Sequence, residues 1–260
     1  LDWLAQPDRF VFTLADDAYP AALLGTDDPP LLLFAQGHLD LLQAPAIAIV
    51  GSRHPTEQGR DNARAFAQAF SEAGLTVVSG LADGVDGAAH EGALLGHAGK
   101  GLATIAIVGT GLDRVYPRQH RDLAHRITQN GLILSEYPLG TPPLNANFPQ
   151  RNRLIAGLSQ GTLVVEATLK SGSLITARLA AEQGREVFAI PGSIHAPQSR
   201  GCHALIRQGA KLVESAQDIL EDLRMVEPRD LSAAPDEAGD GDSSDSLLEA
   251  MGFDPVSLDA

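Results

Sequence analysis

Residues of types that can bind phosphate follow several short apolar runs of this sequence. Glycine lets a backbone approach a ligand closely, serine, lysine and arginine side chains donate hydrogen bonds to phosphate oxygens, and a helix N-terminus adds unpaired amides. The candidates are Gly51, Ser52, Arg53, Gly80, Gly109, Lys170, Ser171, Gly172 and Ser173. Turns and helix caps also use glycine and serine, but six such loops in one chain favour a phosphate site.

An aromatic residue with two arginines close behind it adds a way to hold a nucleobase. Phe148 precedes a proline, which restricts it to extended conformations, and its ring could stack on a base for roughly 1–3 kcal/mol. Arg151 and Arg153 are two positions apart and so do not share a helix face. We expect Arg151 to contact phosphate and Arg153 to pair with an acid such as Glu166. Tyr116 also precedes a proline, and we interpret it as a brace for its loop.

Two well-known nucleotide-binding patterns are absent from the sequence. After the first apolar run stands GSRHPTEQG in place of G-x-G-x-x-G, and the pattern G-x-x-x-x-G-K-[ST] does not occur. These absences disfavour a nicotinamide enzyme or an ATPase. The single cysteine, Cys202, excludes an internal disulfide and a thiolate zinc cage. We expect neither a cofactor nor a metal ion.

The charge of the chain is acidic overall but unevenly distributed. The net charge is −14, of which residues 1–45 carry −6 and residues 229–260 carry −8. The residues between them are neutral, and 114–153 holds six arginines against two acids. Fields are screened within roughly 10 Å at 0.1 M salt, so this local excess matters more to a polyanion than the total charge does. The net charge therefore does not exclude nucleic acid as a ligand.

Short apolar runs alternate with helical patterns from residue 46 onward. The runs are rich in valine and isoleucine, as expected of strands covered on both faces. The expected strands are 46–50, 75–79, 102–108, 131–135, 162–167, 186–190 and 210–213, and the expected helices are 56–73, 84–97, 117–129, 149–159, 173–183, 202–208 and 215–224. The alternation predicts an α/β fold with a doubly wound, mostly parallel sheet. In such a sheet, ligands bind at the carboxyl ends of the strands, where the candidate residues stand.

The organisation along the chain suggests four parts. We expect residues 1–45 to form a short N-terminal extension packed on the core and 46–227 to form the main Rossmann-like domain. Residues 228–245 are rich in Asp, Ala, Gly and Ser and predict a flexible acidic linker. Residues 246–260 begin a new amphipathic pattern, which we interpret as the truncated start of a helical domain. No apolar run reaches about 18 residues, so no membrane span is predicted.

Long motifs in a fixed order resemble those of the DprA (Smf) family. They are GSR at 51–53, SGLADGVDGAAHEGAL at 79–94, GTGLDRVYP at 109–117, SEYPLG at 135–140, NFPQRNRLIAGLS at 147–159, EATLKSGSLITA at 166–177, PGS at 191–193 and GCHALIRQGA at 201–210. The resemblance places Ser52 and Arg53 on the family's phosphate-binding GSR and Phe148 on its base-stacking aromatic. Asn152, in the same motif as Phe148, is expected at the DNA site. Some relatives have a basic residue where this chain has Asn145.

The resemblance implies a cytoplasmic bacterial protein of natural transformation. Members of this family bind incoming single-stranded DNA, protect it and help load the recombinase RecA onto it. They are homodimers built on an extended Rossmann domain, often followed by a winged helix, which residues 246–260 would begin here. The resemblance implies a binding protein rather than an enzyme, with no catalytic residue.

Two other interpretations use the same residues. A nucleotide-processing enzyme, similar to phosphoribohydrolases on a related fold, could draw its acid or base from Asp83, His90, Glu91, Glu136 or Glu166. Those hydrolases carry a glutamate in the helix after their glycine-rich loop, where this chain has Thr176 and Ala177. Alternatively, the chain acts mainly as a scaffold for dimerisation and RecA docking. The apolar segment 202–214 could form the dimer surface or an ordinary core helix.

Overall fold

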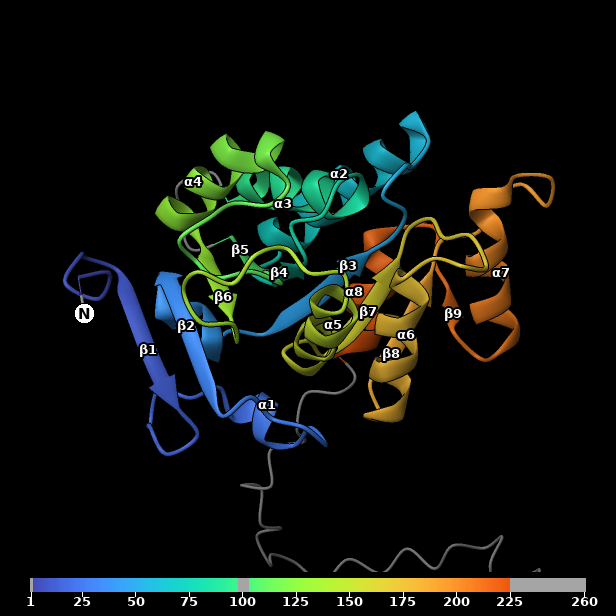
Figure 1. Cartoon of the computed structure of the whole chain (residues 1–260). Coiled ribbons are helices and arrows are strands. Elements are labelled where there is room, and N and C mark those ends of the chain that lie inside the picture. The colour runs from blue at the N-terminus through green and yellow to red at the C-terminus, as the bar shows by residue number, and fades with distance from the viewer. Residues whose placement is uncertain (1, 98–102, 225–260) are drawn as a thin grey trace, which may run out of the picture. The chain divides into compact units, whose positions relative to one another are not determined.

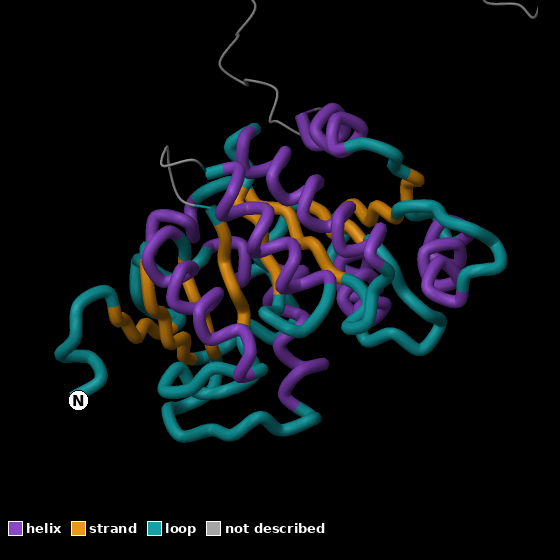
Figure 2. The backbone as a smooth tube through the Cα atoms, turned by 90° about the horizontal axis from the view of Figure 1, so that it is seen from above, coloured by secondary structure: helices purple, strands orange, loops and turns teal. Residues whose placement is uncertain are grey.

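A nine-stranded sheet crosses the part of the chain that the structure describes, with helices on both faces (Figures 1 and 2). The computed structural model describes residues 2–97 and 103–224. Its strands are β1 (Arg9–Thr13), β2 (Leu32–Gly37), β3 (Ala46–Val50), β4 (Thr76–Ser79), β5 (Thr104–Ile107), β6 (Leu132–Ser135), β7 (Gly161–Val164), β8 (Glu186–Ala189) and β9 (Lys211–Leu212). All seven strands expected from the apolar runs are present, and the doubly wound α/β fold is confirmed.

Eight α-helices connect and cover these strands in the described residues. They are α1 (Ala21–Leu24), α2 (Glu57–Glu72), α3 (Val85–Gly96), α4 (Arg121–Asn130), α5 (Asn147–Gly157), α6 (Ser173–Glu182), α7 (Arg200–Arg207) and α8 (Ala216–Arg224). Three short 3-10 turns are η1 (Leu39–Gln43), η2 (Arg118–His120) and η3 (Pro197–Ser199). None of the helices in the described ranges is long and apolar enough to cross a membrane.

The order of the strands fixes where a ligand can enter. The sheet runs β1-β2-β6-β5-β4-β3-β7-β8-β9, and every pair from β6 to β9 is parallel. From β3 the chain winds outward through β4, β5 and β6, and α5 then carries it back to β7 on the other side of β3. The strand order therefore reverses between β3 and β7. In open α/β sheets, such a reversal leaves a crevice at the carboxyl ends of the strands.

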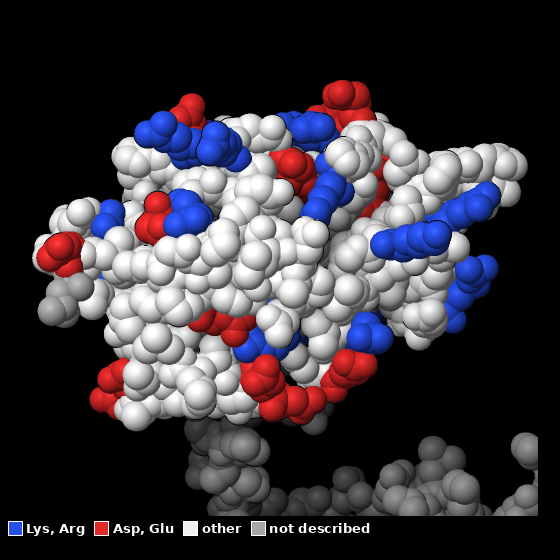
Figure 3. Space-filling view, in the orientation of Figure 1, with Lys and Arg blue, Asp and Glu red and all other residues white. Residues whose placement is uncertain are grey.

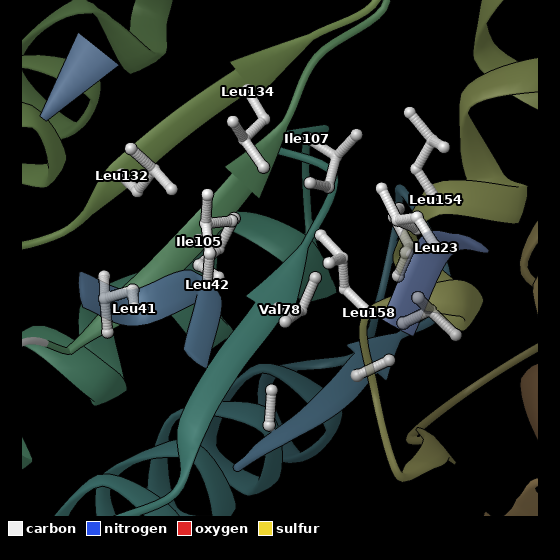
Figure 4. Close-up of a cluster of buried hydrophobic side chains, with 14 of the residues drawn as sticks. Leu23, Leu41, Leu42, Val78, Ile105, Ile107, Leu132, Leu134, Leu154 and Leu158 are labelled. Carbon is white, nitrogen blue, oxygen red and sulfur yellow. The ribbon is translucent and has the colours of Figure 1, made fainter. Parts of the chain in front are cut away.

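Alternating side chains of the strands fill two cores, one on each face. In β3, Ala46, Ala48 and Val50 point to one face, and Ile47 and Ile49 point to the other. The first face packs against α1, η1 and α5, with Leu154 of α5 and Leu158, which follows that helix, lying beside Leu23 of α1 (Figure 4). The second face packs against α2, α3 and α8. Burial on both faces explains why these strands are continuously apolar in sequence.

The N-terminal extension is part of the sheet rather than a separate layer packed on it. β1 pairs antiparallel with β2, and β2 pairs antiparallel with β6, so the sheet gains two strands at this edge. The pairing of β2 with β6 joins segments about a hundred residues apart, and no local sequence pattern indicates this pairing. The extension and the main domain form one compact unit. The expected linker at 228–245 and helical start at 246–260 lie outside the described residues.

Candidate nucleic-acid interface

A pocket of about 560 Å³, here called the main pocket, opens at the reversal between β3 and β7. Its walls come from the loops after β3, β4 and β7 and from the first turns of α5 and α6. It is lined by Val50, Gly51, Ser52, Arg53, His54, Ala82, Asp86, Asn145, Phe148, Pro149, Arg151, Asn152, Ile155, Thr168, Ser171, Gly172, Ser173, Thr176 and Gln198. Nine of the twelve candidate residues are therefore gathered around one hollow.

Arg53, Phe148 and Tyr116 form a cluster at the edge of this pocket. The guanidinium carbon of Arg53 lies 5.6 Å from the centre of the Phe148 ring, within reach of a cation–π contact. The Tyr116 ring lies against Phe148, with centroids 5.5 Å apart and planes tilted by 33°. Arg53 is exposed, and Tyr116 is 46% exposed. The cluster therefore places an exposed cation and an exposed tyrosine ring against the half-buried Phe148 ring, which is a suitable surface for a base with its phosphate.

The loop that carries Arg53 is held by the neighbouring strand ends. The amide of Val85 donates to the carbonyl of Ser52 at 3.1 Å, which ties the loop to the start of α3. Gly84 adopts a φ of +81° where the two loops cross, a conformation that favours glycine. Gly51 lies so close to β7 that a Cβ there would stand 2.9 Å from the carbonyl oxygen of Glu166. Packing therefore requires a glycine at position 51, whether or not this residue also contacts a ligand.

Phe148 is held by a helix start rather than by an extended loop. α5 begins at Asn147, so Phe148 lies in its first turn, and the expectation of an extended conformation there was wrong. The amides of a first helical turn have no partner within the helix, so Pro149 is tolerated there. The Asn147 side-chain amide donates to the carbonyl of Gly109 at 2.9 Å. A Cβ on Gly109 would lie 3.1 Å from the Phe148 ring, so this glycine makes room for the aromatic side chain.

Arg151 is a buried structural residue, in contrast to the phosphate contact predicted for it. Its side chain is 3% exposed, and it donates to the carbonyls of Gly80, at 2.6 Å, and Ile107. Burial lowers the pKa of Arg151 to about 10, with the Asp86 carboxylate acting in the opposite direction, so the guanidinium stays charged at neutral pH. Gly80, also predicted to bind phosphate, leaves room for this guanidinium. Arg151 therefore anchors α5 to the ends of β4 and β5.

Arg153 forms ion pairs as predicted, but with other partners. Its guanidinium bonds both carboxylate oxygens of Glu136, at 3.0 and 2.6 Å, and Asp28 of the N-terminal extension at 3.1 Å. The acid suggested from the sequence, Glu166, instead accepts hydrogen bonds from the amide and hydroxyl of Thr56 at the start of α2. The side chain at 153 points toward Glu136 and the N-terminal extension, which the spacing alone could not reveal. It ties α5 to the edge of the sheet.

The N-terminus of α6 faces the main pocket and carries the serines predicted to bind phosphate. Gly172 is the N-cap residue and gives no side-chain cap, and the hydroxyls of Ser171 and Ser173 bond each other at 2.7 Å. Asn152 reaches from α5 to the carbonyl of Gly172 at 3.5 Å. The hydroxyl of Thr176, one turn further along, lines the same pocket without a hydrogen-bond partner in the described residues. Helix N-termini of this kind attract anions.

Three candidates lie outside the main pocket. Gly80 and Gly109 line a small neighbouring pocket of about 30 Å³, which shares Arg53, Phe148 and Arg151 with it. Lys170 lines a groove between α6 and α7, which shares Ser171 and Gly172 with the main pocket. Tyr116 was interpreted only as a loop brace, and its contact with Phe148 was missed. The Tyr-Pro pair next to a strand end was the available signal, but the distance between the two rings depends on the tertiary fold.

Comparison with known proteins places the chain in a family. Residues 10–224 match the model of a family described as DNA recombination-mediator protein A. The chain belongs to this family. It is 48% identical over 225 residues to Protein Smf of Escherichia coli, covering 86% of this chain and 59% of that protein. It is 51% identical to DNA processing protein DprA of Streptococcus pneumoniae, covering 80% of this chain and 72% of that protein.

Two solved structures of the same family share the fold. The X-ray structure of the Streptococcus pneumoniae DprA covers 83% of this chain and 75% of its own, with a TM-score of 0.77 at 49% identity. DNA processing protein A from Helicobacter pylori covers 83% of this chain and 96% of its own, with a TM-score of 0.74 at 34% identity. The work on the latter protein concerns its unique single-stranded DNA binding mode.

Proposed function

We propose that this protein binds single-stranded DNA along the carboxyl edge of its sheet. In this proposal Phe148, with Tyr116 against it, stacks on a base, and Arg53 holds the adjoining phosphate. Ser52, Ser171 and the free amides at the start of α6 hold a second phosphate. The observation that carries the proposal is the cluster of an exposed cation and two aromatic rings at the mouth of a pocket that the start of α6 and the hydroxyl of Thr176 line.

What a related protein binds also supports single-stranded DNA as the ligand. The Helicobacter pylori protein, which this chain matches over 96% of its length, binds single-stranded DNA. By family membership we extend the proposal to natural transformation, in which the protein protects incoming DNA and helps load RecA onto it. We propose that it does so in the cytoplasm. The chain spans 59% of the Escherichia coli relative, so these roles belong to the proposal for the whole protein.

The carboxylates near the main pocket favour binding over hydrolysis. Asp86 accepts hydrogen bonds from the amides of Gly80 and Ala82, at 3.2 and 3.3 Å, and is 8% exposed. Glu166 is engaged by Thr56. A general acid or base needs a carboxyl group that can reach the substrate. We therefore propose that the protein is not an enzyme, and incubation with nucleoside monophosphates should release no free base.

We also propose that the protein is a homodimer, with the segment 202–214 as the candidate surface. Cys202 and Val213 are buried in the core, whereas Leu212 of the edge strand β9 is 50% exposed. An edge strand with an exposed apolar side chain is open to pairing with a second chain. Light scattering across a range of protein concentrations tests this part of the proposal.

The DNA-binding proposal is tested by two substitutions that affect different forces. Arg53→Glu should weaken binding of a single-stranded oligonucleotide at least about tenfold in 0.1 M salt and reduce the log–log salt slope by about one. Phe148→Ala should weaken binding by about five- to a hundredfold and leave the slope unchanged, because stacking involves no counterion release. Fluorescence anisotropy with a salt titration measures both quantities.

The control for Arg53 is Arg178→Glu, an equal change of charge on an exposed residue outside the main pocket. It should leave affinity within about twofold of the native protein, because Arg178 is paired with Glu182 and lies outside the main pocket. Native affinity and slope in the Arg53 variant would exclude the proposed phosphate contact. Equal losses in the Arg53 and Arg178 variants would mean that only the total charge matters.

A further inference from the structure

A second pocket, of about 430 Å³, lies between α4 and the loop that follows β5. We call it the α4 pocket. It is lined by Gln36, Leu81, Val108, Leu112, Arg114, Val115, Arg121, Asp122, Ala124, His125, Thr128 and Ile133. None of the residues predicted from the sequence to bind DNA lines it, and the proposed stacking site does not use it.

The α4 pocket has an apolar floor and a polar rim. Leu81, Val108, Leu112, Val115 and Ile133 supply the floor, next to the small core beneath α4. The rim combines hydrogen-bond donors and acceptors from Gln36, Arg114, Arg121, Asp122, His125 and Thr128. A nucleobase has the complementary form, with apolar faces and an edge that both donates and accepts hydrogen bonds. The pocket therefore fits a base inserted face-on against aliphatic side chains.

The α4 pocket continues the proposed DNA groove. Val108 lines both the α4 pocket and the small pocket beneath Phe148. Two adjacent residues of one loop lie on either side of the boundary between these pockets. Val115 lines the α4 pocket, and Tyr116 lines the small pocket. A strand with one base on Phe148 would thus meet the α4 pocket on crossing this loop.

Four exposed arginines lie on α4 and in the segment that leads to it. Arg114, Arg118, Arg121 and Arg126 are all exposed, and Figure 3 shows basic groups gathered over α4. Among the ion pairs of the described residues, only Arg114 of these four takes part, with Asp113 at 2.7 Å. Arginines without a carboxylate partner can neutralise backbone phosphates and release counterions. The local positive excess noted in the sequence is therefore concentrated here, since Arg151 is buried and Arg153 is paired.

The chemistry of the rim favours a base over a docked protein. Protein-binding grooves are centred on exposed apolar anchors. In the described residues, none of the large hydrophobic side chains that are exposed lines the α4 pocket. Its apolar groups lie at the floor, where a flat ring inserted face-on could reach them.

We propose that the α4 pocket receives one unstacked base of the same DNA strand that stacks on Phe148, with Arg121 holding the phosphate beside it. This inference rests on the proposed function. It assigns the protein a second base site and extends the bound segment of DNA across the loop at 112–117.

The test fills the pocket without changing the main site. Thr128→Trp places a bulky ring over the α4 pocket, and the hydroxyl that is lost bonds only the carbonyl of His125 in its own helix. Gln129→Trp is the matched control, because the neighbouring residue is exposed and does not line the pocket. The probe is a twelve-residue oligothymidylate with a single 2-aminopurine at successive positions, whose fluorescence reports the surroundings of that base.

With the native protein, two separate positions should change fluorescence on binding. Thr128→Trp should abolish the change at one of them and weaken binding about five- to tenfold, as expected for loss of one base contact. Phe148→Ala should abolish the change at the other position. Arg121→Glu should lower the log–log salt slope by about one unit more than Arg126→Glu does. Arg126 is the control because it lies on the same helix but does not line the α4 pocket.

Equal fluorescence patterns and affinities for the Thr128 and Gln129 variants would overturn the inference, and would leave the pocket to another class of partner. In that case the native protein would still bind the oligonucleotide and lose affinity on substitution of Phe148. Absence of binding by the native protein would instead refute the proposed function itself.

Discussion

Replacing Arg151 by methionine separates a structural anchor from a phosphate contact. Methionine keeps most of the aliphatic volume but removes the donors that reach the carbonyls of Gly80 and Ile107. Each buried carbonyl left unpaired costs about 1–3 kcal/mol. Burial raises the pKa of Asp86 against the opposing charge of Arg151, and in the variant this carboxyl group also loses its cation. Removing one partner of such a buried group costs about 3–5 kcal/mol in other proteins, and we expect a loss of that size.

The expected loss is a large fraction of a typical folding free energy of about 5–15 kcal/mol. It corresponds to a fall in Tm of about 6–20 °C, at about 2–4 °C per kcal/mol for a domain of this size. Urea unfolding followed by circular dichroism measures the free energy, with an unchanged m-value showing that both states keep their compactness. Affinity for DNA is then measured at a temperature at which the variant is folded.

Arg53→Met is the control, because it makes the same chemical change at an exposed position of the same pocket. Its free energy of unfolding should stay within about 0.5 kcal/mol of the native value, while its affinity for single-stranded DNA falls. The reasoning is refuted if Arg151→Met keeps native stability and instead loses affinity together with about one unit of salt slope. That result would support the phosphate contact that the sequence predicted for Arg151.

Two further predictions concern the pocket and the core. Asn145→Lys adds a cation to the lining of the main pocket and should tighten binding of single-stranded DNA and raise the salt slope by about one; an unchanged slope in anisotropy titrations would place Asn145 away from the strand. Burial lowers the pKa of His90 to about 3, so only the unfolded state takes up a proton as the pH falls below about 6.5. Stability should therefore fall by about 2 kcal/mol more between pH 7 and pH 5 in the native protein than in His90→Gln, measured by urea unfolding, and equal losses would contradict this assignment.

Much of the fold could be predicted because its parallel strands are buried on both faces. Such strands are apolar at every position, so each appears in the sequence as a distinct run. The antiparallel strands β1 and β2 were not predicted, because proline and aspartate residues interrupt this part of the sequence. In addition, β6, which pairs with β2, is distant from it in sequence. The start of α5 was also placed two residues too late, at Pro149, although this proline lies in the first turn of a helix that begins at Asn147.

The sequence by itself determined that the loops rich in glycine and serine would gather at one edge of the sheet, because parallel strands carry their carboxyl ends to the same side. Which residue of α5 faces inward was decided only by tertiary structure. The helix begins at Asn147 and packs across β4 and β5, which buries Arg151 and leaves Arg153 to meet Glu136 and Asp28. The contact of Arg53 with Phe148 and the α4 pocket likewise depend on distances between segments far apart in the chain. Local patterns record what each segment buries, whereas the packing of those segments sets which side chains meet.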